Sequence, residues 1–381
     1  MPHFFIGDKM ARVKSKAGKL SISEMRSLIN KKAGMPVAHD LTADNPTEVK
    51  DWIPTGSTWL NGIICRGRMA GIPVGKLSEI AGMEASGKSY MAAQIAANAQ
   101  QMGVDVIYFD AESAIDPAFL EHSGVDLNQL LYLQAMSVEF VLETIEDLLK
   151  TNDNKMLFIW DSLALTPAIS DVEGTFNPNE SVAVKARVLA KGMSKLVVSL
   201  ANAQSTLLVL NQLKTNIAVQ NPKYATDSEK YVCPGGKSMS YAYSLRIWLT
   251  GRRGASSYIV DSKGFRVGNE VKARLEKSRF GTAGRICNFK ILWGEDVGIR
   301  DDDSLFEAIK SSEHLNSAGA WWTLAHEDGE KEKFQAPKWK ELMQGEKFRA
   351  RVMQLLDEEV VLKFDKRLVE AQGFYEEDEE E

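Results

Sequence analysis

The stretch Ile80-Ala81-Gly82-Met83-Glu84-Ala85-Ser86-Gly87-Lys88-Ser89 fits the pattern G-x-x-x-x-G-K-[ST] from its first glycine onward. In this pattern the backbone N–H groups of the loop hold phosphates, the lysine reaches the terminal phosphates, and the serine hydroxyl binds Mg²⁺. Residues 76–81 are expected to form a strand, and 90–99 are rich in residues that favour helices. Bound phosphates would therefore lie at a helix N-terminus. A chance loop of Gly and Ser is not expected to have this context.

The composition is that of an ordinary soluble protein, with 381 residues, 44% of them hydrophobic and 26% charged. The length allows two or three domains. Cys65, Cys233 and Cys287 are far apart, so neither a disulfide framework nor a zinc cluster is expected, which favours a reducing cytoplasm. Charges in 1–20 argue against a signal peptide. The most apolar run, 196–210, contains Asn, Gln and Ser and is expected to be a helix end and a buried strand.

The charge is unevenly distributed along the chain. Six acidic residues at 376–381 account for the whole formal net charge of −6, and 1–36 hold eight Lys and Arg against two acidic residues. This pattern fits a polyanion partner whose site the tail competes for. Two solvated chain ends explain it equally simply, and charge alone favours that reading.

The first part of the chain is expected to be a helical arm. Ile22, Met25, Leu28 and Ile29 have helical spacing within 21–32 and form one narrow apolar stripe. Residues 36–54 are rich in Pro, Asp, Asn and Thr and are expected to be a linker. The pattern leaves open whether the arm docks on its own core or on a neighbouring subunit.

From residue 53 apolar runs alternate with helical stretches, which indicates an α/β fold with a mostly parallel sheet. Ligands of such sheets bind at the carboxyl ends of the strands. Strands are expected at Leu77–Ala81, Val104–Phe109, Leu130–Leu133, Met156–Trp160 and Thr206–Leu210, and helices near Lys88–Met102, Pro117–His122, Val138–Lys150 and Ser181–Ala203.

Two carboxylates at these strand ends are candidates for chemistry. Asp161 follows an apolar strand and would hold Mg²⁺ through water, opposite Ser89. Such an aspartate alone would more often be a strand-end cap, and the preceding phosphate loop is what favours the metal. Glu112 is the candidate that orients and deprotonates water for ATP hydrolysis, and the alternative is an acidic residue at a helix N-terminus.

Two long stretches, 166–180 and 213–237, leave the sheet on the side of the phosphate loop. The second holds four lysines with Pro and Gly breakers and few core residues. Long segments without clear structure in a compact domain are usually functional or disordered. Their composition does not say what they bind.

Taken together, the motifs resemble the RecA-type recombinase family, which includes bacterial RecA and the phage UvsX-like strand-exchange proteins. The chain is similar to the family over about 53–324, and the matching stretches occur in the family's order. They are 55–57, 82–89, 110–117, 160–167, 210–212 and 234–237. Residues 318–322 and the helical segment near 346–356 resemble the small C-terminal domain of bacterial RecA, in which Trp321 and Trp322 are expected to be core residues.

The resemblance implies roles for individual residues. Glu112 would be the catalytic carboxylate, and Gln212 would sense the γ-phosphate. Lys277 and Arg279 would reach the ATP of the adjacent subunit, whereas the pattern alone suggests alternating exposure on an edge strand. Ser89 and Asp161 would bind the metal. The implied ATP-binding residues are Gly82, Met83, Glu84, Ala85, Ser86, Gly87, Lys88, Ser89, Tyr90, Asp116 and Phe119.

The two long stretches would then be the DNA-binding loops. The implied DNA-binding residues are Gly174, Lys185, Arg187, Lys214, Ile217, Gly235, Gly236 and Lys237. The implied subunit-interface residues are Ile22, Met25, Leu28, Ile29, Tyr241 and Arg246, with the arm docking on the neighbouring core. The first loop differs from the family in composition and length.

The resemblance implies a DNA-dependent ATPase that uses ATP and Mg²⁺, forms helical filaments on single-stranded DNA, and exchanges strands with homologous duplex in recombination and repair. Single-strand-binding and mediator proteins would be partners, in the cytoplasm of a bacterium or a phage-infected host. The expected organisation is a RecA-like P-loop ATPase core at 53–300, an arm and linker at 1–52, a small α+β domain at 301–366 and an autoinhibitory acidic tail at 367–381. A hexameric motor and a regulatory ATPase that binds protein remain the alternatives.

Overall fold

The computed structural model describes residues 19–34, 37–43, 48–174, 184–219, 224–251, 257–293 and 298–363. Contacts divide the chain into two units, Met1–Glu48 and Val49–Glu381. The acidic tail and the part of the first predicted DNA loop at 175–180 lie outside the described residues. Within the described ranges, no helix is long and apolar enough to cross a membrane.

The first unit contains helix α1 (Ile22–Ala33), which confirms the predicted helix. Ser21 and Glu24 form a capping box at its start, and Gly34 ends it in the left-handed region with φ 69°. The predicted apolar stripe of Ile22, Met25, Leu28 and Ile29 is exposed, and no residue of α1 is buried. Docking of this stripe on a neighbouring subunit stays a prediction.

The second unit is organised around a sheet to which the described residues contribute ten strands. Its parallel part confirms the predicted mostly parallel α/β core. In sheet order this part consists of β10 (Leu245–Thr250), β3 (Leu77–Gly82), β7 (Thr206–Gln212), β6 (Met156–Asp161), β4 (Asp105–Asp110) and β5 (Leu130–Gln134). Each predicted strand stopped one or two residues early, because backbone pairing continues through polar residues after the last apolar one.

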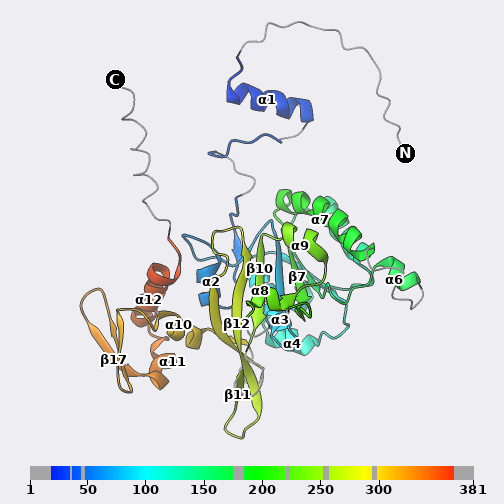
Figure 1. The fold of residues 1–381 in the computed structure, drawn as a ribbon. Helices are drawn as coiled ribbons and strands as arrows, with labels where there is room; N and C mark the ends of the chain where they lie inside the picture. Colours follow the sequence, from blue (N-terminus) through cyan, green and yellow to red (C-terminus); the bar gives the residue numbers. More distant parts are fainter. Residues whose placement is uncertain are drawn as a thin grey trace, which may run out of the picture. The chain divides into compact units, whose positions relative to one another are not determined.

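An antiparallel extension, which sequence reasoning did not predict, continues the sheet beyond β10. It consists of β12 (Arg266–Ser278), β13 (Ile286–Leu292) and β14 (Gly298–Arg300), with β11 (Tyr258–Val260) paired to β12. The hairpin of β11 and β12 projects beyond the rest of the sheet (Figure 1). Strand β12 lies between β10 and β13, but its pairing with β13 extends only from Gly268 to Arg274. Lys277 and Ser278 pair with β10 alone, which agrees with the pattern-based expectation of an edge strand at this stretch.

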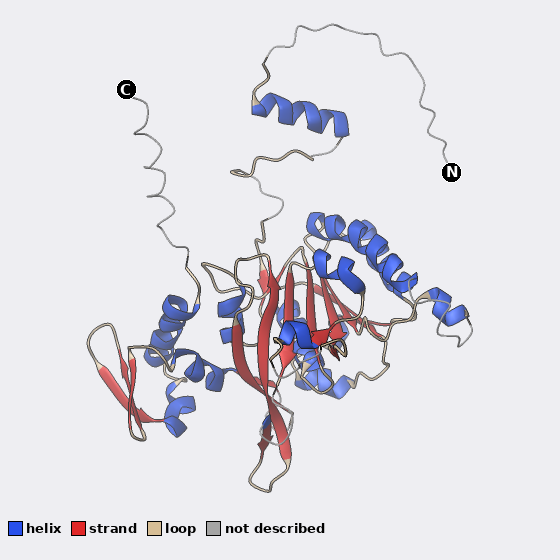
Figure 2. Ribbon diagram, in the orientation of Figure 1, coloured by secondary structure: helices blue, strands red, loops and turns tan. Residues whose placement is uncertain are grey.

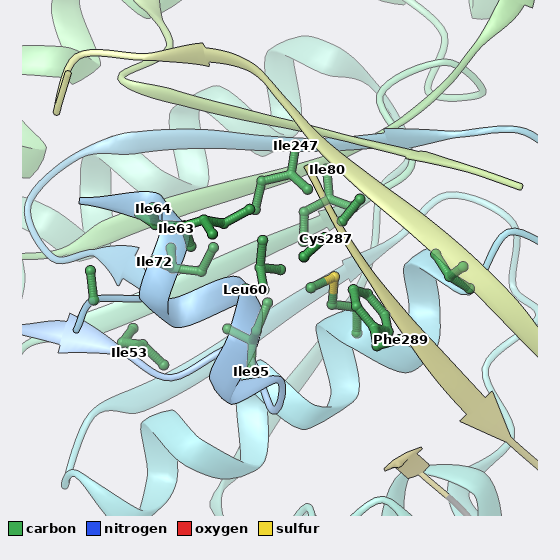
Figure 3. Close-up of a cluster of buried hydrophobic side chains, with 14 of the residues drawn as sticks. Ile53, Leu60, Ile63, Ile64, Ile72, Ile80, Ile95, Ile247, Cys287 and Phe289 are labelled. Atoms are coloured by element: carbon green, nitrogen blue, oxygen red, sulfur yellow. The ribbon is translucent and has the colours of Figure 1, made fainter. Parts of the chain in front are cut away.

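Helices pack on both faces of the sheet (Figure 2), and each face has its own apolar core. One core, part of which is drawn in Figure 3, joins α2 and α3 to inward residues such as Ile80 and Ile247. The other joins α5, α7 and α9 to the alternate residues of the same strands, such as Phe158 and Val209. The helices are α2 (Thr58–Ile64), α3 (Lys88–Gln101), α4 (Pro117–His122), α5 (Val138–Thr151), α7 (Val184–Asn202) and α9 (Gly236–Ala242).

The last part of the described chain carries a separate three-stranded antiparallel sheet and short helices. Trp322 packs edge-on against Phe306 with 5.0 Å between ring centroids, as expected for a core residue. Trp321 is 43% exposed, so its predicted core position is wrong. Neighbouring strand residues point to opposite faces, and only one of the two can face the core. The elements are α10 (Asp301–Ile309), β15 (Leu315–Ala318), β16 (Trp321–Ala325), β17 (Lys331–Gln335), η3 (Ala336–Lys338), α11 (Trp339–Leu342), α12 (Glu346–Leu355) and η4 (Leu356–Val360).

The remaining elements are short. They are β1 (Trp52–Ile53), β2 (Ile72–Pro73), η1 (Leu127–Gln129), α6 (Ile169–Glu173), β8 (Lys214–Thr215), α8 (Asp227–Lys230) and β9 (Tyr231–Val232).

Truncation of Ile80 tests the contribution of the first core. Ile80 is fully buried on the central strand β3. We expect Ile80→Val to lower the free energy of unfolding by about 0.5–1.5 kcal/mol and Ile80→Ala by about 2–5 kcal/mol, because the second leaves a larger cavity. Urea unfolding followed by circular dichroism measures both. Val198→Ala on α7 is the control, since Val198 is 61% exposed. Equal losses of unfolding free energy for Val198→Ala and Ile80→Ala would contradict the placement of Ile80 in the core.

Candidate functional site

The predicted phosphate loop connects β3 directly to α3, as the motif requires. Gly87 precedes α3 with φ +90°, a conformation that favours glycine. A Cβ on Gly87 would lie 2.3 Å from Cδ1 of Ile291, and a Cβ on Gly82 would lie 2.2 Å from Oγ of Ser86. Oγ of Ser86 is buried without a hydrogen-bond partner among the described residues. The loop therefore depends on both glycines and presents a buried hydroxyl that a ligand could satisfy.

Lys88 lies across the mouth of this loop. Its Nζ donates to the carbonyl oxygens of Gly82 at 3.2 Å and Met83 at 2.8 Å. Burial lowers the pKa of Lys88, while the nearby carboxylates of Asp161, Glu112 and Glu84 oppose that shift. The ammonium is thus held against the carbonyl oxygens of its own loop.

Asp161 and Ser89 form the predicted metal pair. Oγ of Ser89 donates to Oδ2 of Asp161 at 3.1 Å, and the hydroxyl of Tyr108 donates to the same oxygen at 2.8 Å. Burial raises the pKa of Asp161, and the bonds from Tyr108 and Ser89 act in the opposite direction. A hydroxyl and a single carboxylate suit Mg²⁺, which keeps several waters and binds substrate phosphates. The described part of the chain holds no cluster of three or more His, Cys, Asp or Glu residues suited to a metal.

Glu112 is supported by an aspartate at the end of β4. Asp110 accepts hydrogen bonds from the backbone N–H groups of Glu112 at 2.8 Å and Ser113 at 2.9 Å, and also from the two residues that follow. Ser162, next to Asp161, donates from Oγ to Oε1 of Glu112 at 3.1 Å. The Glu112 carboxylate is exposed. The structure therefore brings the predicted catalytic carboxylate beside the predicted metal carboxylate.

Three of the predicted ATP-binding residues, Tyr90, Asp116 and Phe119, lie at the starts of α3 and α4. Asp116 caps α4 by accepting from Ala118 N at 3.0 Å, and Phe119 packs edge-on against Tyr90 with 4.6 Å between ring centroids. A cavity of about 350 Å³ opens beside the phosphate loop. It is lined by 85–90 and by five residues that sequence reasoning missed, namely Arg266, Asn269, Val271, Ile291 and Trp293. Four of these residues lie on the unpredicted strands β12 and β13, and Trp293 follows β13 directly. The spacing of the five residues in the sequence does not indicate a binding site.

A buried polar network connects the phosphate strand to the second predicted DNA loop. Nδ2 of Asn211 donates to Oε1 of Glu79 at 3.0 Å and to the carbonyl of Pro234 at 2.9 Å. Nε of Arg246 donates to Oε2 of Glu79 at 2.6 Å. Arg246 is 9% exposed and has this partner within the chain, so its predicted role at a subunit interface rests on the resemblance alone.

Gln212 ends β7 beside the start of the phosphate loop. It pairs in register with Gly82, and the backbone N–H of Leu213 donates to the carbonyl of Gly82 at 3.0 Å. The sequence predicts no clear structure in the loop that follows, and this prediction is wrong for its described part, because β8 and β9 pair as antiparallel strands. Lys214 is exposed and Ile217 is 97% exposed.

The end of the second predicted DNA loop lies against Leu163, which is between β6 and the first predicted DNA loop. Gly235 and Gly236 have φ +108° and +78° at the start of α9, and an added Cβ on Gly235 would lie 3.2 Å from Leu163. Nζ of Lys185 donates to the carbonyls of Leu163 at 2.8 Å and Ala164 at 3.2 Å, which anchors the base of the first loop. Burial lowers the pKa of Lys185. Of the other predicted DNA-binding residues, Gly174, Arg187 and Lys237 are exposed.

Lys277 and Arg279 lie away from their own phosphate loop. Leu249 of β10 is level with both Gly82 and Ala273, whereas Arg246 is level with both Glu79 and Lys277. Lys277 therefore lies three residues further from the carboxyl end of β3 than Gly82 does. That offset is about 10 Å along the strand. Nζ of Lys277 donates to the carbonyl of Tyr241 at 3.0 Å, and Arg279 donates to the same carbonyl at 2.8 Å. Tyr241 is 71% exposed.

These features define a class of protein, a parallel α/β protein with a phosphate-binding loop at the carboxyl edge of its central strand. The family model described as the RecA N-terminal domain matches residues 20–298. Protein RecA of Bifidobacterium breve is 30% identical over 282 residues, which are 74% of this chain and 67% of that protein. Protein RecA of Colwellia psychrerythraea is 30% identical over 282 residues, 74% of this chain and 76% of that protein. The chain belongs to the RecA family.

The buried ion pair of Glu79 and Arg246 is expected to stabilise the folded chain. Arg246→Met leaves a buried carboxylate without its cation, which we expect to lower the free energy of unfolding by about 3–5 kcal/mol. Combining it with Glu79→Gln removes that charge and keeps an acceptor for Asn211, so most of the loss should be recovered. Urea unfolding of the single and double variants measures this. If the double variant is less stable than Arg246→Met alone, the loss of stability does not come from an unpaired Glu79 carboxylate.

Proposed function

We propose that this chain is a DNA-dependent ATPase that polymerises with ATP and Mg²⁺ into helical filaments on single-stranded DNA, pairs that strand with homologous duplex and exchanges strands in recombination and repair. The observation that carries the proposal is the division of the site within one chain. The phosphate loop and Glu112 lie at one edge of the sheet, and Lys277 and Arg279 lie toward the other. A second subunit would complete the site.

The chain's own residues would act on ATP as follows. The N–H groups at the start of α3, with Lys88, would bind the phosphates, and Ser89 and Asp161 would hold Mg²⁺. Bound Mg²⁺ would neutralise charge that develops on the phosphates. Glu112, oriented by Ser162, would position and deprotonate the attacking water. Lys277 and Arg279 of the adjacent subunit would stabilise the transition state, an effect on the order of 10³–10⁵ in rate where such a cation is required.

Two connections would couple the ATP site to DNA. At the phosphate edge, Gly82 is bonded to Leu213, and Asn211 holds the carbonyl of Pro234 just before Gly235. At the other end, helix α9 runs from Gly235 to the carbonyls that accept bonds from Lys277 and Arg279. A change at the γ-phosphate sensed by Gln212 would therefore reach both the loop and the subunit boundary.

The proposed DNA surface combines the exposed lysines Lys214 and Lys237 with the exposed apolar residue Ile217. Lysines neutralise phosphates, and an apolar side chain can insert between bases. We include single-strand-binding and mediator proteins as partners, and a bacterial cytoplasm, of a phage-infected cell in particular, as the location. The acidic residues 376–381 would compete with DNA for this surface.

Stimulation by DNA tests the proposal directly. We expect ATP hydrolysis by the wild-type chain to rise strongly with single-stranded DNA, because filament formation brings Lys277 and Arg279 of one subunit to the ATP of the next. The double variant Lys277→Ala with Arg279→Ala should lose this stimulation. ATPase assays with and without DNA measure both, and electron micrographs should show filaments. Closed rings, or no stimulation of the wild type, would overturn the recombinase proposal.

A mixing experiment tests whether the site is shared. Glu112→Gln and the Lys277→Ala, Arg279→Ala variant should each hydrolyse ATP more slowly than the wild type. For Glu112→Gln, which lacks the base, the rate should fall by a factor of about 10² or more. In a mixture, some boundaries would join an intact Glu112 to an intact Lys277 and Arg279, so the rate per subunit should exceed that of either variant alone. Additive rates at every mixing ratio would show that the site lies within one chain.

A further inference from the structure

Three adjacent parallel strands, β5, β4 and β6, carry a repeated diagonal pattern of tyrosine and aspartate. Tyr132 pairs in register with Tyr108, and Asp110 pairs in register with Asp161. Residues two apart in a strand share a face, so Tyr108 and Asp110 lie on the same face of β4. Each tyrosine therefore lies diagonally across from an aspartate at or near the carboxyl end of the next strand, a separation that long side chains can reach.

Both diagonals are closed by hydrogen bonds. The hydroxyl of Tyr132 donates to Oδ2 of Asp110 at 3.0 Å, and the hydroxyl of Tyr108 donates to Oδ2 of Asp161 at 2.8 Å. Tyr108 is fully buried in the core that contains α3, whereas Tyr132 is 43% exposed. Neither tyrosine belongs to the phosphate-loop motif or to the two carboxylate motifs.

The two aspartates have different tasks, so the two tyrosines should too. Oδ2 of Asp161 accepts from both Tyr108 and Ser89, and its Oδ1 accepts no hydrogen bond within the described part of the chain. Because Tyr108 and Ser89 both donate to Oδ2 of Asp161, Oδ1 is the oxygen that remains for Mg²⁺. Asp110 instead binds the backbone N–H groups of four successive residues that begin with Glu112. A donor on Asp110 therefore acts on the segment that carries Glu112.

We infer that Tyr108 and Tyr132 are positioning residues for the two halves of the ATP site. Tyr108 orients Asp161 toward Mg²⁺, and Tyr132 orients Asp110 and, through it, the segment of Glu112. This inference rests on the proposed ATP hydrolysis. The hydrogen bonds are to charged acceptors, which are stronger than bonds between neutral groups.

The isosteric variants Tyr108→Phe and Tyr132→Phe separate the two roles. The first readout is the Mg²⁺ concentration that gives half-maximal binding of a fluorescent ATP analogue, which needs no turnover. We expect Tyr108→Phe to raise it about tenfold, because a lost hydrogen bond to a charged group corresponds to roughly that factor. Tyr132→Phe should leave it unchanged and lower kcat several-fold with KM for ATP unchanged.

Tyr243→Phe is the matched control. Tyr243 is as fully buried as Tyr108 but belongs to the core on the other face of the sheet. It should leave both readouts at wild-type values. Thermal unfolding without nucleotide, followed by circular dichroism, shows whether each variant keeps the wild-type fold.

The outcomes distinguish this inference from the proposed function. A wild-type chain that neither binds the analogue with Mg²⁺ nor hydrolyses ATP would overturn both. A wild-type chain that does both, with Tyr108→Phe retaining the wild-type Mg²⁺ requirement, would overturn the role of Tyr108 alone. Equal losses in all three Phe variants, in step with lowered midpoints of unfolding, would show that the tyrosines only stabilise the fold.

Discussion

The parallel register of the central strands is the constraint on which the rest of the structure depends. Register places Gly82 beside Gln212 and Asp110 beside Asp161, so the ends of β3, β7, β4 and β6 meet at one edge. Parallel strands all present their carboxyl ends to the same side, and side chains from distant parts of the sequence are thereby brought together. The placement of the phosphate loop, of the predicted metal ligands Ser89 and Asp161 and of the base of the second loop follows from this one arrangement.

Buried polar contacts then hold this edge in a defined geometry. Glu79 is buried on the phosphate strand and accepts from both Arg246 and Asn211. Breaking such a pair leaves an uncompensated charge in a medium where charges are poorly solvated. Because Asn211 also binds the carbonyl of Pro234, the same network fixes where the second loop returns to the core. The rigidity of the core and the placement of a proposed DNA loop therefore have a common physical origin.

Much of this could be predicted from sequence because the signals are local. The phosphate loop, the strand before it and the helix after it follow from residues within one short stretch, and the apolar runs of β3, β6 and β7 mark buried strands. The antiparallel strands β12 and β13 were missed because their alternating polar residues give a weaker signal. The pairing of β8 and β9 was missed because these strands are two residues long.

By itself, the sequence determined the α/β class and predicted the phosphate loop and the candidate carboxylates Glu112 and Asp161, because each depends on residue types at short spacing. Only the tertiary structure decided which side chains share a site. The diagonal bond from Tyr108 to Asp161, the cavity wall formed by Arg266 and Trp293, and the distance of Lys277 from its own phosphate loop all depend on strand order and register. Register and strand order join residues far apart in the chain, and the spacing of residues within one short stretch does not say which strand pairs with which.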